Sequence, residues 1–257
     1  MASASVASAR EFIARAELPP SRHARAAPAS VLDLAFDTAK NQAAVVGSDI
    51  VSFVQGVTKE RREAIVHSSL LAQQVATKKV ADPNQLFLWY DEYFSVLTNI
   101  GWVVQEKNFQ QFHESSENFQ AHKAILAVAT TLLGAAPAAL ALVKTTLESL
   151  QSMDKDSPWI TIFDRESQHA KTARFQISLA EQAADGQFFV TLMAFALEAE
   201  STITQVLFFK TKTNEATLRH SSGKVTIDTV VLDGVSGAIK QKLAGSAQDY
   251  IKTLPNF

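Results

Sequence analysis

The spacing between hydrophobic positions changes once along the chain, near residue 154. From residue 31 to about residue 153, apolar side chains recur every three or four positions, which is the period of an amphipathic helix. After that point the spacing falls to two, as in the alternating series Phe175, Ile177 and Leu179. Helices and strands that occupy separate blocks of a sequence predict an α+β fold rather than a βαβ repeat.

This change of period divides the chain into three predicted parts. Residues 1–30 form an N-terminal arm, and residues 31–153 form a helical bundle with a central apolar helical hairpin. Residues 154–257 form a four-stranded, mostly antiparallel sheet with a C-terminal helix. We expect the bundle and the sheet to share one core.

Capping and turn residues place the individual elements. Thr58 is suited to cap a helix over residues 59–80, and Asp228 or Asp233 is suited to start the terminal helix. Ser222-Gly223 resembles a turn within the last strand region. The other predicted helices cover residues 8–17, 31–57 with a break at 47–49, 86–104 and 105–123, and the strands lie within 173–182, 187–200, 202–213 and 216–228.

The most unusual stretch is Ala124–Val143, which contains twenty residues without a charge, between Lys123 and Lys144. Gly134 is suited to end a helix, and Pro137 is suited to the first turn of the next one. We therefore predict two helices of about ten residues, each about 15 Å long. Neither helix alone would cross a hydrocarbon layer of about 30 Å.

A second apolar segment, Leu86–Val104, carries only Asp91 and Glu92 as charges in nineteen residues. A helix that is apolar nearly all round is either buried in a bundle or in contact with a membrane. The two segments together give ten candidate residues for membrane or lipid contact: Ile125, Leu126, Leu132, Leu133, Gly134, Pro137, Leu140, Leu142, Trp89 and Phe94.

Composition narrows the function classes. Hydrophobic residues make up 47% of the 257 positions and charged residues 19%, which is enough apolar material for a sizeable core. The net charge of −2 provides no basic field, so we expect no nucleic-acid partner. The absence of cysteine excludes disulfides, thiolate nucleophiles and thiolate metal ligands.

Motifs for chemistry are weak throughout the sequence. Glu166 and His169 have the spacing of one half of a di-iron site, but a second such pair is missing, and His113 with Glu117 gives only a two-ligand surface pair. No G-x-S-x-G elbow occurs, although a Ser-His-Asp triad assembled in space stays open. We assign no catalytic residue, no metal site and no cofactor, and the balance favours a protein that is not an enzyme.

The leading hypothesis is a non-enzymatic protein that binds lipid or inserts into a membrane through a sheltered apolar hairpin. This layout resembles that of α-helical pore-forming toxins and other membrane-active effectors, which would make the protein a toxin-like or virulence factor. The N-terminal thirty residues have no apolar signal-peptide region, so we expect a soluble protein that is cytoplasmic or exported without a conventional signal peptide.

Two alternatives stay open. The first is a structural or self-assembling subunit, a homo-oligomer that docks through its N-terminal arm. The second is a carrier of an apolar small ligand, such as an acyl chain, held in a pocket between bundle and sheet. The aromatic residues available to line that pocket are Phe188, Phe189, Phe195, Phe208 and Phe209.

Overall fold

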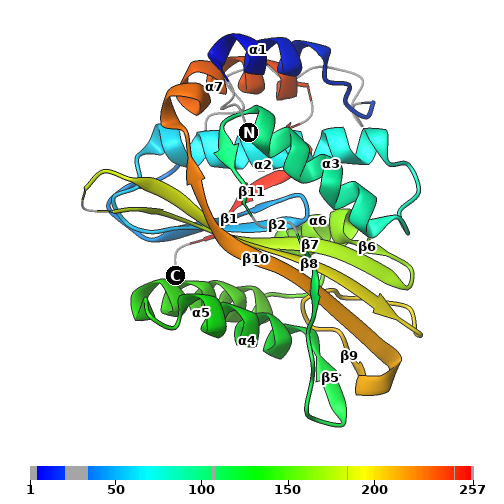
Figure 1. The fold of residues 1–257 in the computed structure, drawn as a ribbon. Helices are drawn as coiled ribbons and strands as arrows, with labels where there is room; N and C mark the ends of the chain where they lie inside the picture. The colour runs from blue at the N-terminus through cyan, green and yellow to red at the C-terminus, as the bar shows by residue number, and fades with distance from the viewer. Residues whose placement is uncertain (1–4, 21–33, 106–107, 184, 246, 256–257) are drawn as a thin grey trace.

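A central sheet separates two layers of helices (Figure 1). The computed structural model describes residues 5–20, 34–105, 108–183, 185–245 and 247–255. Within these residues, nine strands form one mixed sheet in the order β11-β1-β2-β7-β8-β10-β3, with β4 beside β10 and β6 beside β7. The strands are β1 (Gln42–Val46), β2 (Asp49–Phe53), β3 (Trp102–Val103), β4 (Gln110–Gln111), β6 (Gln168–His169), β7 (Thr172–Gln182), β8 (Phe188–Ala199), β10 (Ala216–Ile227) and β11 (Ile251–Thr253).

The pairing between β2 and β7 is parallel, and the other described pairings are antiparallel. A parallel pair requires a crossover connection, and here the crossover contains five helices of the described chain, α2 to α6. Two further short strands, β5 (Asn118–Gln120) and β9 (Lys210–Lys212), pair with each other away from the main sheet.

The helices cover the sheet on both faces. One face is covered by α1 (Val6–Arg15), α2 (Lys59–Lys79), α3 (Leu86–Asn99) and α7 (Thr229–Leu243), and the other by the antiparallel pair α4 (Ala121–Leu133) and α5 (Pro137–Gln151) (Figure 1). The helix α6 (Pro158–Ser167) contributes Ile160 and Phe163 to the same core as α4 and α5.

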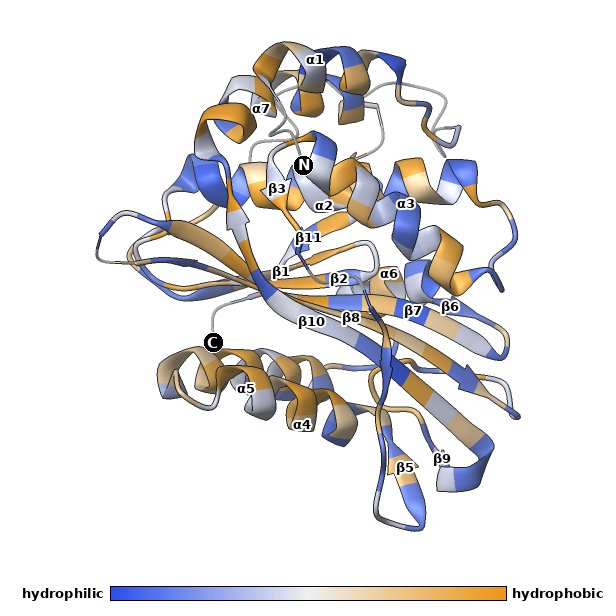
Figure 2. Ribbon diagram, viewed as in Figure 1, coloured by the Kyte–Doolittle hydropathy of each residue, from blue (hydrophilic) through white to orange (hydrophobic). Residues whose placement is uncertain are grey.

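Alternate residues of each central strand enter two different cores. On β7, Phe175, Ile177 and Leu179 pack with α4, α5 and α6, whereas Ala180 packs with α2 and α3. Figure 2 shows the apolar residues concentrated on the sheet and on the helix faces that meet it. The mixed helix-and-sheet class is therefore confirmed, but the sheet is the centre of the molecule and not an appendage to a bundle.

The predicted helix over residues 31–57 is wrong, and with it the helical bundle: Gln42–Val46 and Asp49–Phe53 are strands, joined at Gly47 with φ of +57°. Nine of these ten strand residues are buried. A strand that is buried on both faces has apolar residues at nearly every position. Some of these positions then match the spacing of a helix by chance. The part of that prediction on residues 31–33 lies outside the described residues.

The prediction of four strands is also wrong, because the main sheet of the described residues has nine strands and its short strands were missed. β10 continues for twelve residues through Ser222 and Gly223, which pair with Met193 and Leu192 of β8 instead of forming a turn. Of the run 202–213, only Lys210–Lys212 is a strand. Residues 158–167 form a helix that starts with a Ser157 cap, and residues 102–103 leave the helical pattern for β3.

Local signals were read correctly elsewhere. The hydroxyl of Thr58 caps α2, Asp228 caps α7, and α4 and α5 separate at residues 134–136 with Pro137 in the first turn of α5. The two hairpin helices have 13 and 15 residues, somewhat longer than the predicted ten.

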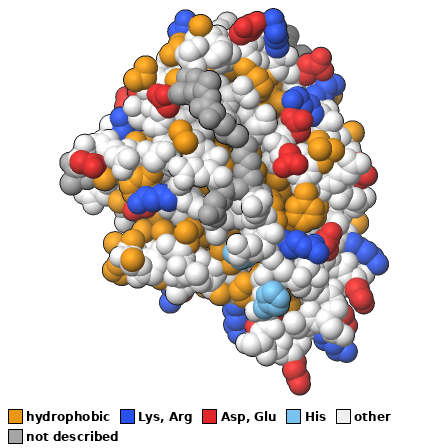
Figure 3. Space-filling view, in the orientation of Figure 1, with side chains coloured by type: hydrophobic (Ala, Val, Ile, Leu, Met, Phe, Trp, Pro, Cys, Tyr) orange, Lys and Arg blue, Asp and Glu red, His pale blue; other side chains and the backbone are white. Residues whose placement is uncertain are grey.

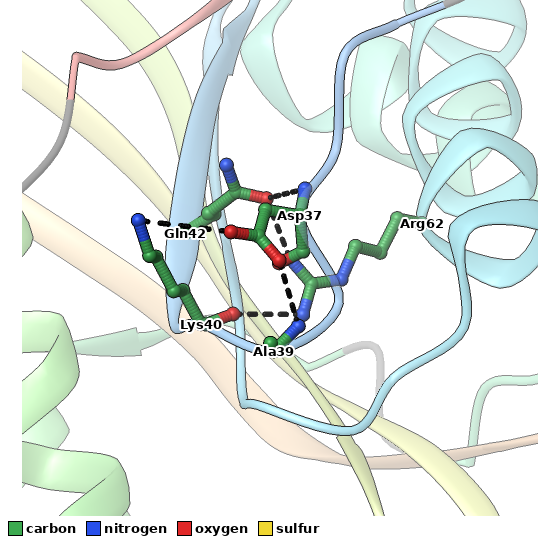
Figure 4. A network of polar contacts seen from close by, with 5 residues as sticks. All are labelled: Asp37, Ala39, Lys40, Gln42 and Arg62. Atoms are coloured by element: carbon green, nitrogen blue, oxygen red, sulfur yellow. Dashed lines mark hydrogen bonds and ion pairs between the residues drawn. The ribbon is translucent and has the colours of Figure 1, made fainter.

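Arg62 ties the start of α2 to the loops around the β1–β2 hairpin (Figure 4). Its side chain is fully buried, and its guanidinium faces the rings of Phe36 and Phe53. Its nitrogens donate five hydrogen bonds of 2.8–3.2 Å, to the Gln42 side chain and to the carbonyl oxygens of Val57, Asp37, Lys40 and Val54.

The N-terminal helix α1 packs on its own chain. Ala9 and Ile13 are buried, the guanidinium of Arg10 donates to the Gly234 carbonyl oxygen at 3.0 and 3.2 Å, and Lys242 donates to that of Ala14 at 3.1 Å. Gly234 permits this contact, because a Cβ there would lie 2.9 Å from the Val6 methyl groups.

We predict that Arg62→Lys lowers the free energy of unfolding by about 2–4 kcal/mol, since an ammonium cannot reach five acceptors and leaves buried carbonyl groups unpaired. Urea denaturation would measure the change. The matched control is Arg15→Lys, because Arg15 is exposed and, among the described residues, forms an ion pair with Glu11 alone. A change of less than about 0.5 kcal/mol is expected there. Equal effects in the two variants would contradict this role of Arg62.

Gly234 and Gly237 of α7 provide a second matched pair. Gly237→Ala should stabilise the protein by about 0.5–1 kcal/mol, because alanine favours helix and a Cβ at residue 237 has nothing within 4 Å. Gly234→Ala should instead loosen α1, since the added methyl group meets Val6. Limited proteolysis near α1 and thermal denaturation would detect the difference, and indistinguishable variants would argue against close docking of α1.

Candidate functional site

Eight of the ten residues predicted for lipid contact lie together on the α4–α5 hairpin. Ile125, Leu133 and Leu142 point into the core beneath the sheet and are at most 5% exposed. Leu126, Leu132 and Leu140 are half-buried, and Gly134 and Pro137 are exposed where the two helices meet.

The other two candidates, Trp89 and Phe94, belong to α3 on the opposite face of the sheet. Both are at most 2% exposed, and Trp89 stacks on Tyr93. The sheet therefore separates them from the hairpin, and the structure does not bring the two apolar segments together.

The outer face of the hairpin is uncharged. Between Lys123 and Lys144, its exposed residues are small or polar and neutral: Ala127, Thr130, Thr131, Gly134, Ala135, Pro137, Ala138 and Ala141. Figure 3 shows hydrophobic side chains over α4 and α5 with few charges among them.

The two threonine hydroxyl groups on that outer face already have partners. Thr130 donates to the Leu126 carbonyl oxygen at 2.7 Å, and Thr131 donates to that of Ala127 at 3.1 Å. A hydroxyl that bonds within its own helix loses little when water is removed. Transfer of these two threonines into an apolar environment therefore costs less free energy than transfer of a hydroxyl group that depends on water for its hydrogen bond.

The contact between the hairpin and the sheet is almost entirely apolar. Among the described residues, one side-chain hydrogen bond crosses it, between the hydroxyl groups of Ser52 on β2 and Thr146 on α5, 3.1 Å apart. The remaining contact consists of aliphatic and aromatic side chains of both partners. Such an interface has little directional preference and is held by the exclusion of water.

The contact on the opposite face of the sheet is also largely apolar, but it contains a buried polar network that was not predicted. Asp49 is 1% exposed, and its carboxylate accepts hydrogen bonds from Ser69 of α2 at 2.7 Å and from Ser178 of β7 at 3.0 Å. Burial raises the pKa of Asp49 to about 7, although the two hydroxyl groups lower it in part. Both serine hydroxyl groups donate to its carboxylate.

Further hydrogen bonds extend this network along α2 and α3. Gln73 of α2 donates to the Val46 carbonyl oxygen at 2.8 Å and accepts from the hydroxyl of Ser48 at 3.1 Å. The hydroxyl of Tyr90 on α3 donates to the carbonyl oxygens of Phe175 and Phe195 at 2.9 and 2.7 Å. α2 and α3 are thus bonded to the sheet at several buried points.

A sequence signal for this network exists in hindsight. Ser68, Ser69, Gln73 and Gln74 interrupt the apolar pattern in the middle of α2, and Asp49 interrupts a run of buried strand residues. Polar groups at core positions indicate that hydrogen-bond partners are present.

The weak metal motifs do not assemble into a site. Glu166 pairs with Arg165 at 2.6 Å, and burial together with nearby Arg174 lowers the pKa of His169 to about 4. Among the described residues, no group of three or more His, Asp or Glu side chains could hold a metal ion.

The aromatic residues proposed for a ligand pocket lie in the cores: Phe188, Phe189, Phe195 and Phe209 are each at most 7% exposed. A cavity of about 540 Å³ lies instead between α1 and α2. Its lining includes the apolar Phe12, Ala16 and Val75 and five charged side chains, Glu11, Arg15, Glu17, Lys78 and Lys79.

Asp49 should make stability depend on pH. Because its folded pKa of about 7 exceeds the ordinary value of 3.8, the folded protein holds a proton that the unfolded chain has released at intermediate pH. The free energy of unfolding should therefore fall as pH rises from about 4 through about 7, by up to about 1.4 kcal/mol per pH unit.

Asp49→Asn should remove that contribution, because an amide resembles the protonated carboxyl and does not titrate. Urea denaturation at several pH values between about 5 and 8 would measure both proteins. Asp91→Asn is the control, since Asp91 lies exposed on α3. A pH profile of Asp49→Asn that parallels the wild-type profile would contradict the assignment.

Comparison with solved structures gives distant similarities, two of which follow. No protein-family model matches the chain, and no curated protein matches it. A solved structure named "DELTA-ENDOTOXIN" is similar with a TM-score of 0.36 and 12% identity, over 81% of this chain and 88% of that chain. Another, named "Structure of the Evf virulence factor", is similar with a TM-score of 0.38 and 11% identity, over 89% of this chain and 98% of that chain. At these TM-scores the similarities carry no argument about function.

Proposed function

We propose that the protein binds lipid membranes through the α4–α5 hairpin, which leaves the sheet and places its apolar inner face in the bilayer. The observation behind the proposal is the difference between the two helical layers. Both layers pack on the sheet through apolar side chains, but among the described residues α2 and α3 add several buried hydrogen bonds to it, whereas the hairpin adds one hydroxyl pair.

The energetics favour movement of the hairpin over movement of α2 and α3. Hydrocarbon is as apolar as a protein core, so an apolar face can exchange one for the other at little cost. Separating α2 from the sheet would instead break the hydrogen bond from Ser69 to Asp49 and those that join Gln73 to Val46 and Ser48, at about 1–3 kcal/mol for each group left unpaired.

The outer face of the hairpin supports the same proposal. It has no charge between Lys123 and Lys144, and its threonine hydroxyl groups bond within α4. Between Lys123 and Lys144, neither face of the hairpin therefore carries a group that resists hydrocarbon strongly.

The hairpin acts as a surface element and not as a pair of spans in this proposal. In the described chain, no helix combines the length and the apolar character that crossing a membrane requires. An apolar hairpin that is released at a membrane is a property expected of a toxin-like or virulence factor. We propose that role from the hairpin alone.

A reversible lock would test the proposal. Ser52 and Thr146 face each other with their hydroxyl oxygens 3.1 Å apart, so Ser52→Cys with Thr146→Cys would place two thiols within disulfide reach. The chain has no cysteine of its own, so this disulfide would be unique.

The oxidised double variant should lose at least about tenfold in vesicle binding and dye release, because the hairpin can no longer leave the sheet. Reduction should restore both activities, and each single cysteine variant should behave like the wild type. Flotation of vesicles and fluorescence leakage would measure the two effects. Undiminished binding by the oxidised protein would overturn the proposal, as would a wild-type protein that binds no vesicle.

A further inference from the structure

The uncharged part of the hairpin is bounded by two lysines, one on each helix, which lie at similar distances from the hairpin tip. Lys123 is in the first turn of α4, ten residues before the last residue of that helix, Leu133. Lys144 follows Pro137, the first residue of α5, by seven positions. At 1.5 Å per residue, the two lysines lie about 15 Å and about 10 Å from the tip. Both are exposed.

A third lysine comes from a distant part of the sequence. Lys210 of β9 is paired with Gln120, the residue immediately before α4. Burial lowers the pKa of His122, and the positive charges of Lys210 and Lys123 lower it further. Within the described part of the chain, neither lysine forms an ion pair. Lys144 has a loose, exposed contact with Glu148 at 3.7 Å.

Of the acidic residues in this region, Glu148 lies on α5 and Glu215 lines the same groove as Lys210, whereas Glu117 lies further from the hairpin. The β5–β9 pair runs from Gln120 and Lys210 at the hairpin end to Asn118 and Lys212 at the other. Beyond that outer end, the Thr213 amide donates to the Glu117 carbonyl oxygen. At about 3.3 Å per residue, Glu117 follows the path of the strand about 10 Å away from Gln120.

We infer that Lys123, Lys144 and Lys210 bind the phosphate groups of anionic lipids and hold the hairpin at a depth of one leaflet. This inference rests on the proposed membrane binding and specifies its lipid class. Each lysine near an anionic surface contributes about 1 kcal/mol of attraction, or about fivefold in partitioning.

The same lysines limit insertion. A lysine in the middle of the hydrocarbon costs about 2.5–3.5 kcal/mol, so the hairpin stops when the lysines reach the headgroups. Its uncharged part then extends about 10–15 Å inward, which is roughly half of a 30 Å hydrocarbon layer. The bilayer is entered from one side and is not crossed.

Vesicle partitioning of a double variant would test the lipid class. Lys123→Gln with Lys210→Gln should bind vesicles of phosphatidylcholine with 30% phosphatidylglycerol about 25-fold more weakly than the wild type. The control is Lys78→Gln, which removes one positive charge from exposed Lys78 of α2 in the opposite layer, and a loss of less than twofold is expected, against about fivefold for each hairpin lysine. Circular dichroism of each variant would verify folding.

Outcomes for the two proposals are separable. If the wild type binds pure phosphatidylcholine as tightly as anionic vesicles, or if the double variant matches Lys78→Gln, the lysine inference fails while membrane binding stands. If the wild type binds neither kind of vesicle, both proposals fail.

Single cysteines in this cysteine-free chain would measure the depth. A fluorophore at Ala135→Cys, at the tip, should be quenched by lipids labelled deep in the acyl chains. A fluorophore at Thr145→Cys, beside Lys144, should be quenched mainly by lipids labelled at the headgroup. Deep quenching at both positions would overturn the proposed depth, and so would deep quenching at neither.

Discussion

The two faces of the sheet have different chemistry, and the two helical layers depend on this difference. Toward α2 and α3 the central strands present Asp49, Gln176 and Ser178, which are buried and hydrogen-bonded. Toward α4 and α5 the same strands present aromatic and aliphatic side chains. Because side chains alternate along a strand, one face of a sheet can carry a buried polar network while the other face, only a few ångströms away, is almost entirely apolar. Both layers are held by the exclusion of water, and the layer of α2 and α3 is fixed in addition by the geometry of its hydrogen bonds.

This arrangement places restrictions on both layers. A buried carboxyl such as Asp49 is tolerated only while Ser69 and Ser178 keep their positions, which favours a fixed α2. The hairpin has no such requirement, yet its departure would uncover Phe175, Phe195 and their neighbours beneath the sheet. Exposure of that apolar surface to water would cost free energy, so lipid must cover the sheet as well as the hairpin. The proposed mechanism therefore brings the sheet face down onto the membrane.

Elements marked by local signals could be predicted from the sequence. The helix after Thr58 and the break between Gly134 and Pro137 are examples, since each depends on neighbours within a few positions. The strands at residues 42–53 could not be recognised, because burial on both faces hides their alternation of two. The hairpin was visible as a candidate site through its composition alone. The network at Asp49 and the position of Lys210 beside α4 were not, because their partners are distant in the sequence.

The parallel contact between β2 and β7 has a consequence for the order of folding. Asp49 and Ser178 bond across this pair although 129 positions separate them. Contacts of such long range form late, because the loop between them must first be closed. The helices α4 and α5 are local structures within that loop and can form earlier. A folding chain therefore carries a finished apolar hairpin before the surface that covers it exists. During that interval the hairpin is open to water, to other chains and to any lipid nearby.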